Sequence, residues 1–144
     1  NVFTAERSRL HFRVLVNDVT GDCWPPGMPI LMTRVWPFHV IPLPTAIVMV
    51  FNFQSQARWV YLDGREHSDP NIYVPSYNGE SIGRWEGDTL VVDTRNFETH
   101  NHFIDRLVPL SPDFRIVERV RSIDNGDRFI GIQDTRGRFA QLDR

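Results

Sequence analysis

The chain has 144 residues, of which 41% are hydrophobic, so it is long enough to form one domain with its own core. Its 16 basic and 18 acidic residues nearly cancel, leaving a formal net charge of -2. No stretch gathers the basic residues that a nucleic-acid-binding protein uses. All the basic residues are arginine, which excludes chemistry that depends on a lysine. We therefore expect a single domain over residues 1–144 and no nucleic-acid partner.

The first third of the chain differs in composition from the rest. Residues 4–16 favour the start of a short helix with Thr4 as its N-cap. Residues 17–46 contain six prolines, which is typical of an extended or irregular segment. We expect this proline-rich segment to wrap around a core built by the following residues. The longest apolar stretch, 41–53, contains two of the prolines and is too short to cross a bilayer, so no membrane span is expected.

From residue 46 onward the sequence alternates between β-rich segments and turn signals. Asp-Gly, Gly-Asp and Asn-Gly pairs follow or separate the segments, and such pairs favour hairpins. A long loop with two prolines occupies residues 65–79. The segments that we predict as strands are 46–53, 58–62, 81–85, 89–94, 114–123, 128–134 and 138–142.

Three hairpins in succession, without any repeated strand–helix–strand pattern, indicate an all-β protein. We predict an antiparallel meander that forms a small barrel or a curved sheet. With six to eight strands, exposed edges favour closure of the sheet or covering by the proline-rich segment.

Three motifs resemble those of a large group of bacterial β-rich proteins. They are the Cys-x-Pro-Pro-Gly turn at 23–27, the Tyr-Leu-Asp-Gly-Arg strand end at 61–65 and the Gly-x-Trp-Glu-Gly-Asp-Thr-Leu hairpin at 83–90. The resemblance covers roughly residues 20–127 and implies an extracytoplasmic location, but it brings no defined activity. Many members of the group have histidine where this chain has Glu80. The Gly-x-Trp element is also similar to that of lipocalins and related barrels, although it lies mid-chain here.

The loop after the second predicted strand holds the first candidate site. His67 is flanked by carboxylates, and a histidine in such a setting can act as a general base near neutral pH. Arg65 is suited to hold an anionic group or to stabilise a developing oxyanion. A solvated turn shaped by Asp63 and Gly64 is the alternative interpretation.

Charged residues inside the predicted strands form the second candidate site. Glu118 alternates with Ile116 and Val120, and a carboxylate that faces a core must be paired or neutral. Arg58 and Asp93 also lie inside strand patterns, and an arginine, Glu118 and a histidine would make an acid–base set in a barrel lumen. The alternative is a structural salt bridge from Glu118 to Arg58 or to Arg84.

His100 and His102 form the third candidate, because residues two apart in an extended segment project to the same face. Such a pair could bind a metal with a third ligand from His67, Glu98 or Asp105. A polar loop is the interpretation that we favour, and we therefore expect no metal or other cofactor.

These candidates lead to one main functional hypothesis. We expect a small-molecule enzyme, a lyase, isomerase or hydrolase, that uses general acid–base catalysis on a partly apolar substrate. The catalytic candidates are His67 or His102 as the base, Glu118 or Asp93 as its partner, and Arg58 or Arg65 as the anion holder. The residues expected to line the substrate pocket are Trp59, Tyr61, Tyr73, Tyr77, Trp85 and Phe103. The alternatives are a lipocalin-like binding protein and a metalloprotein that uses His100 and His102, and a homo-oligomer remains open in each case.

Overall fold

The computed structural model describes residues 23–33, 35–100, 102–105, 108–123 and 128–136. The predicted N-terminal helix and the last predicted strand lie outside these residues. Within them the protein is mainly β, as predicted. The strands are β1 (Phe38–Pro42), β2 (Ala46–Phe51), β3 (Gln56–Tyr61), β4 (Glu80–Glu86), β5 (Thr89–Arg95), β6 (Phe103–Asp105), β7 (Val108–Pro109), β8 (Arg115–Ile123) and β9 (Arg128–Arg136). The described residues also contain a short helix, α2 (Ile30–Thr33), and a 3-10 turn, η1 (Phe53–Ser55).

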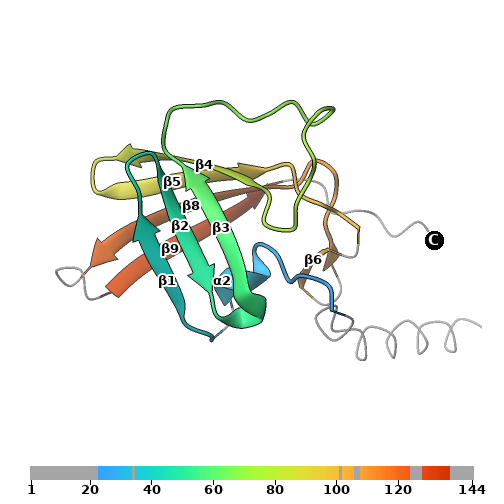
Figure 1. Cartoon of the computed structure of the whole chain (residues 1–144), viewed down its shortest axis with the longest axis horizontal. Helices are drawn as coiled ribbons and strands as arrows, with labels where there is room; N and C mark the ends of the chain where they lie inside the picture. The colour runs from blue at the N-terminus through green and yellow to red at the C-terminus, as the bar shows by residue number, and fades with distance from the viewer. Residues whose placement is uncertain (1–22, 34, 101, 106–107, 124–127, 137–144) are drawn as a thin grey trace, which may run out of the picture.

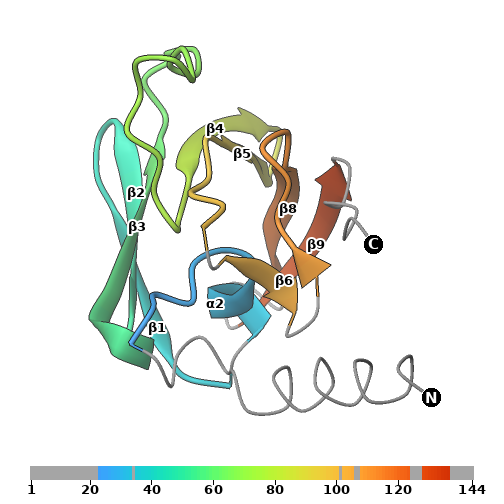
Figure 2. The ribbon, with the colours of Figure 1, turned by 90° about the vertical axis from the view of Figure 1, so that its right-hand side faces the viewer.

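Seven of these strands form one sheet in the order β1-β2-β3-β4-β5-β8-β9. The sheet curls so that β1 to β3 face the other four strands across the core, which confirms the predicted curved sheet (Figures 1 and 2). The three predicted hairpins are present as the antiparallel pairs β2–β3, β4–β5 and β8–β9. The strands β6 and β7 pair separately.

One neighbouring pair, β3 and β4, runs parallel, so the strands do not form an unbroken antiparallel meander. A parallel pair needs a connection of a dozen residues or more, because the chain must return to the end at which it started. The loop over residues 62–79 is long enough to make this return. It arches above β3 and β4 in Figure 1, and its contacts with the sheet create the cleft described below.

The core lies on the concave face of the curled sheet. Alternate residues of β2, β5 and β8 point inward, as the period of a strand requires. The short helix α2 and the turn before it close one end of the core, where Met28 and Leu31 are buried (Figure 2). The Met28 amide donates a hydrogen bond of 3.0 Å to the Tyr77 carbonyl and so fixes this segment to the long loop.

The proline-rich segment does more than wrap the core. Its described part contains both α2 and β1, and β1 joins the sheet as an edge strand. Pro42 is compatible with this strand because an edge position leaves one side of the backbone without a partner. Prolines therefore place the segment at the border of the sheet without excluding it. No helix in the described part of the chain is long and apolar enough to span a membrane.

Candidate functional site

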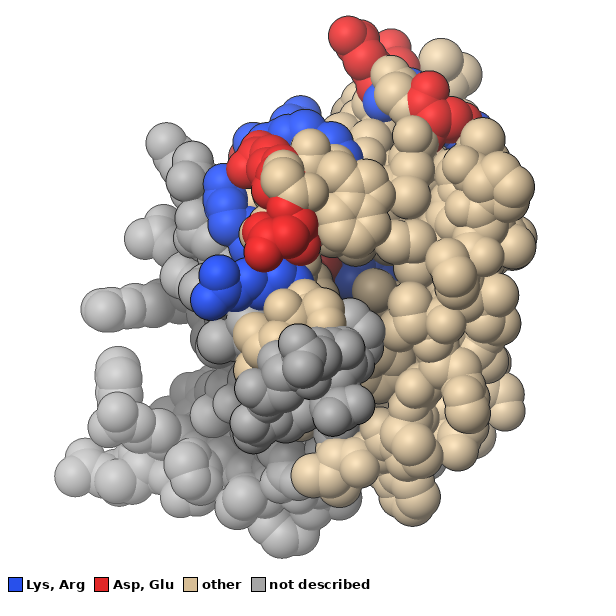
Figure 3. All heavy atoms as spheres, turned by 90° about the vertical axis from the view of Figure 1, so that its left-hand side faces the viewer, with Lys and Arg blue, Asp and Glu red and all other residues tan. Residues whose placement is uncertain are grey.

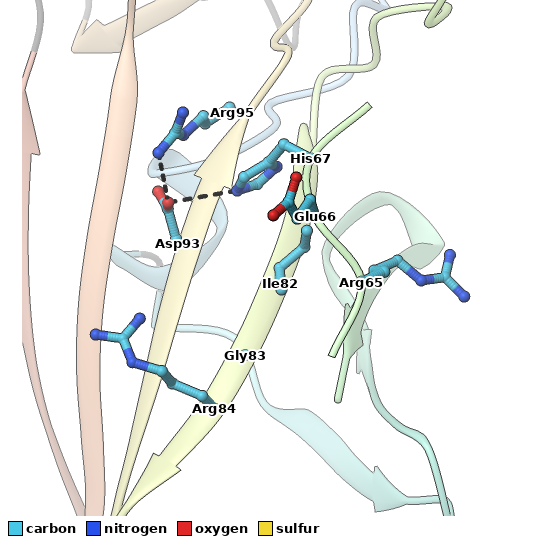
Figure 4. A pocket seen from close by; sticks show the side chains of 8 residues that line it. All are labelled: Arg65, Glu66, His67, Ile82, Gly83, Arg84, Asp93 and Arg95. Atoms are coloured by element: carbon cyan, nitrogen blue, oxygen red, sulfur yellow. Dashed lines mark hydrogen bonds and ion pairs between the residues drawn. The ribbon is translucent and has the colours of Figure 1, made fainter. Parts of the chain in front are cut away.

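A cleft of about 350 Å³ lies on the convex face of β4 and β5, where the residues that follow β3 cross them. The side chains around it are mostly charged, with one aliphatic wall from Ile82 (Figure 4). Its lining residues are Arg65, Glu66, His67, Ile82, Gly83, Arg84, Asp93 and Arg95.

Strand alternation and register explain why these residues meet. Glu80, Ile82 and Arg84 share the convex face of β4, while Ser81 and Gly83 face the core. In the β4–β5 pair Ile82 lies opposite Asp93. The β4–β5 hairpin therefore supplies Ile82 and Asp93 to the cleft as neighbours on one face.

His67 lies between two carboxylates. Its Nδ1 is 3.3 Å from Glu80 Oε2, and its Nε2 is 3.4 Å from Asp93 Oδ2. The second contact lacks hydrogen-bond geometry, so Nε2 is buried without a hydrogen-bond partner. Buried polar atoms without partners are uncommon and need an explanation in the chemistry of the site.

Glu80 is held by donors from the loop and from the end of β5. The Ser68 amide and hydroxyl donate to its two oxygens at 2.9 and 2.7 Å, and the Asn96 amide nitrogen donates at 2.9 Å. Burial would raise the pKa of Glu80, but the hydrogen bonds from Ser68, His67 and Asn96 outweigh it and hold the pKa below its usual range. Glu80 is therefore an ionised anchor for His67.

Asp93 is held by two arginines. The Arg115 Nε and Nη2 atoms donate to its two oxygens at 2.6 and 2.8 Å, and Arg95 donates at 3.0 Å. Burial would raise the pKa of Asp93, but these arginines outweigh it and keep the pKa low. The two arginines therefore keep Asp93 charged without any contribution from His67. The His67 imidazole can thus interact with another group.

The predicted anion holder, Arg65, lines the cleft but points away from Asp93 (Figure 4). Its guanidinium pairs with Asp63 at 2.6 Å and lies 3.9 Å from the centre of the Tyr61 ring. Arg84 and Arg95 lie closer to the centre of the cleft, on either side of Asp93. They belong to β4 and β5. Arg84 pairs with Glu86 at 2.7 Å and Arg95 with Asp93 at 3.0 Å, so an anion in the cleft would share them with these carboxylates.

The second predicted set splits between the two faces of the sheet. Glu118 pairs with Arg58 in the core, so the predicted structural salt bridge is confirmed and Arg58 is the partner. Arg58 also donates to the Ser81 hydroxyl at 3.0 Å and to the Thr94 hydroxyl at 2.8 Å. Asp93 points to the opposite face and does not join this network.

His100 and His102 do not converge. His102 is buried, its Nδ1 lies 2.7 Å from the Glu98 carbonyl, and its ring packs against Tyr77 and Phe97. His100 is exposed and packs edge-on against Trp24. In the described ranges no group of three His, Cys, Asp or Glu side chains is arranged to hold a metal. The metalloprotein alternative therefore gains no support from the geometry.

The aromatic residues expected to line one pocket are dispersed. Trp59 and Tyr61 stack on the convex face of β3 with ring centres 6.4 Å apart, and Trp85 is exposed near the end of β4. Tyr77 donates to the His100 carbonyl at 2.9 Å. Burial and the nearby Glu80 charge raise the pKa of Tyr73, so it stays neutral. Phe103 lies in β6, and its side chain is outside the described residues.

Sequence reasoning missed Glu80, Arg95 and Arg115 as parts of the site. Alternation alone places Glu80 on the same face of β4 as Ile82 and Arg84, which was a usable signal. The strand order was not available from the sequence, so the approach of Arg115 to Asp93 could not be predicted.

The chain matches no family model, no curated protein and no solved structure. The resemblance noted in the sequence therefore stays a prediction, and the function has to be argued from the cleft itself.

Proposed function

We propose that the protein is an enzyme that uses general acid–base catalysis on a small molecule bound in the cleft around His67. The observation that carries this proposal is the orientation of the imidazole. Glu80 accepts the Nδ1–H of His67, and this leaves the lone pair on Nε2, where a base needs it.

The surroundings of Nε2 suit a proton transfer. A proton taken up at Nε2 would face the Asp93 carboxylate, while the Nδ1–H stays on Glu80. Proton abstraction from a substrate carbon would give lyase or isomerase chemistry, and proton abstraction from water would give hydrolysis. Nε2 is buried against Asp93 in this conformation, so the proposal requires the loop carrying His67 to shift outward before a substrate reaches this atom.

The lining residues suggest the substrate class. Arg84 and Arg95 flank the cleft and are suited to a carboxylate or phosphate group. Ile82 supplies an apolar wall beside them. We therefore expect a small molecule with one anionic group and an apolar part.

A carrier that binds the same molecule without changing it is the second candidate. The observation that favours it is the coverage of Nε2, since a binding protein does not need access to this atom.

A panel of small carboxylates and phosphate monoesters tests the proposal on the purified chain. Amide chemical shifts in NMR spectra identify compounds that bind around Ile82 and Asp93, and proton spectra then follow their conversion. For a converted compound, His67→Gln should lower kcat by about 10²–10⁴-fold with binding retained. His39→Gln, which changes an exposed histidine on β1, is the matched control. A bound but unconverted compound would establish the carrier, and a panel without any binder would refute both.

A further inference from the structure

The edge strand β1 is exposed on both faces. All five of its residues are exposed, although its sequence, FHVIP, is largely apolar. The exposure extends beyond the strand to Val35 and Trp36 on one side and Leu43 on the other. A contiguous apolar segment of this kind on a soluble surface marks a contact site. We call residues 35–43 the edge patch.

The edge patch carries no charge. Residues 35–57 contain no Lys, Arg, Asp or Glu. Figure 3 shows a broad tan surface without Lys, Arg, Asp or Glu on the right, whereas the charged side chains gather at the top and on the left. A protein usually protects an edge strand with charges, and this edge lacks them.

The backbone of β1 offers free hydrogen-bonding groups. The Leu43 amide donates to the Ala46 carbonyl, and the Asn52 amide donates to the Pro37 carbonyl. Because paired and unpaired residues alternate along an antiparallel ladder, the amides of Phe38 and Val40 point away from β2. Pro42 falls on the same side, where its missing N–H breaks no bond to β2. The free edge is therefore intact at its centre.

We propose that β1 pairs antiparallel with β1 of a second copy of this chain, with Val40 opposite Val40 of the partner subunit. This register overlaps the whole strand and places Phe38 opposite Pro42 of the partner subunit. The two Val40 residues exchange hydrogen bonds, and each Phe38 amide donates to the Pro42 carbonyl across the interface. The two sheets become continuous through a two-fold axis.

A second copy fits this surface because a two-fold interface must be complementary to itself. An uncharged apolar patch meets this condition, whereas a patch with charges of one sign does not. Trp36 and Phe38 are about half exposed, so they would contribute roughly 200 Å² per subunit, on the basis of about 150–250 Å² for a fully buried aromatic side chain. With the aliphatic side chains and the edge backbone, the contact is at the small end of specific interfaces. The dimer should therefore depend on protein concentration.

Charge substitution at Val40 tests the proposal, with sedimentation velocity over a concentration series of the full chain as the measurement. The unaltered chain should show a monomer–dimer equilibrium. Val40→Lys and Val40→Glu should each be monomeric, because like charges then face each other across the axis. A one-to-one mixture of the two variants should recover the dimer, which also shows that both are folded. Ile72→Lys, at a loop residue that is 82% exposed, is the matched control and should dimerise normally.

The outcomes separate clearly. Loss of the dimer in each variant and its recovery in the mixture would support the proposal. An unaltered chain that stays monomeric at all concentrations would overturn it. A dimer that survives both charge substitutions uses another surface, and this result would overturn it as well.

Discussion

At the scale of single residues, the buried Arg58–Glu118 ion pair should have a large effect on the stability of the fold. Both side chains are almost completely buried on the core face of the sheet. Burying two charges is costly, and the cost is offset only when each charge is neutralised and hydrogen-bonded. The Ser81 and Thr94 hydroxyls complete this arrangement for Arg58. The pair should therefore be sensitive to the loss of one partner and tolerant of the loss of both.

Removal of one partner should destabilise the protein strongly. Glu118→Gln leaves the Arg58 charge buried without a counter-ion, so we expect a loss of about 3–5 kcal/mol in the free energy of unfolding. The double variant Arg58→Met with Glu118→Leu should recover most of this loss. Urea denaturation measures all three proteins. A single variant as stable as the unaltered chain would contradict the proposed role of the pair.

Two glycines with positive φ provide a matched test of close packing. Gly27 has φ +59, and a Cβ there would lie 2.2 Å from the Tyr77 carbonyl oxygen and 2.6 Å from His102 Nε2. Gly87 has φ +65 in the β4–β5 turn, with no atom within 4 Å of such a Cβ. Gly87→Ala should cost about 1–2 kcal/mol for the backbone conformation alone. Gly27→Ala should cost about 2–5 kcal/mol, since overpacking adds to it. Equal losses in thermal unfolding would refute the packing argument.

The sequence predicts part of this residue-scale picture. Alternation placed Glu118 on an apolar face, and burial of a carboxylate then required a partner. The choice between Arg58 and Arg84 depended on which faces of β3 and β4 turn toward β8, which no local pattern reveals. For His67, the flanking acidic residues suggested a neighbouring carboxylate. Asp93, one of the two partners predicted for the base, does lie 3.4 Å from His67 Nε2, whereas Glu80, which lies 3.3 Å from Nδ1, was not foreseen.

At the scale of elements, Glu80 is one of several contacts that hold the loop over residues 62–79 to the sheet. The Asn78 side chain also donates to the Ala57 carbonyl, and the Leu62 amide donates to the Thr45 carbonyl. The carboxylate at the start of β4 accepts hydrogen bonds from Ser68 in the loop and from Asn96 beyond β5. Asn96 has φ +56, a conformation that asparagine tolerates better than most residues, and its side chain also reaches the Ser68 carbonyl at 3.1 Å. Glu80 is thus the anchor of the part of the loop next to His67.

Neutralisation of the Glu80 carboxylate should weaken the attachment of the loop over residues 62–79 to the sheet. Glu80→Gln removes the charge and one acceptor, so the Ser68 amide should exchange with deuterium faster and the fold should lose about 1–3 kcal/mol. Hydrogen exchange followed by mass spectrometry measures the loop directly. Glu86→Gln, at the exposed far end of the same strand, is the control and should leave exchange in the loop unchanged. Unaltered exchange in the Glu80 variant would show that other contacts hold the loop.

Local sequence signals were sufficient to predict the hairpins. They did not reveal how the hairpins connect within the sheet. Each hairpin was marked by its own turn residues, because the partner strands are close in sequence. The parallel contact of β3 and β4 is set by the path of a long loop, and loop composition does not encode direction. The proline content of residues 17–46 predicted irregular structure, but edge strands accept proline, so β1 was not foreseen.

At the scale of the whole molecule, the ionisable groups Glu80, Asp93 and His102 should each make the fold less stable as the pH falls. The pKa values of Glu80 and Asp93 are lowered in the fold. The stability they contribute is complete above their ordinary values, near about 4, and is lost as the pH falls through the lowered values. The pKa of His102 is lowered by burial, against the opposing effect of the Glu98 and Met28 carbonyls. Acidification should therefore destabilise the fold in two stages.

His102 should be responsible for the first stage. Below a pH of about 6.5 the unfolded chain binds a proton at this residue that the folded chain does not, so the free energy of unfolding should decline as the pH falls from that value. His102→Gln should flatten this decline between about pH 6.5 and 5 and keep the steeper loss near pH 4 that the carboxylates cause. His39→Gln, at the exposed edge strand, should keep both stages. Urea denaturation at a series of pH values gives the profile of each protein. An unchanged profile above pH 5 in the His102 variant would contradict the assignment of the first stage to this residue.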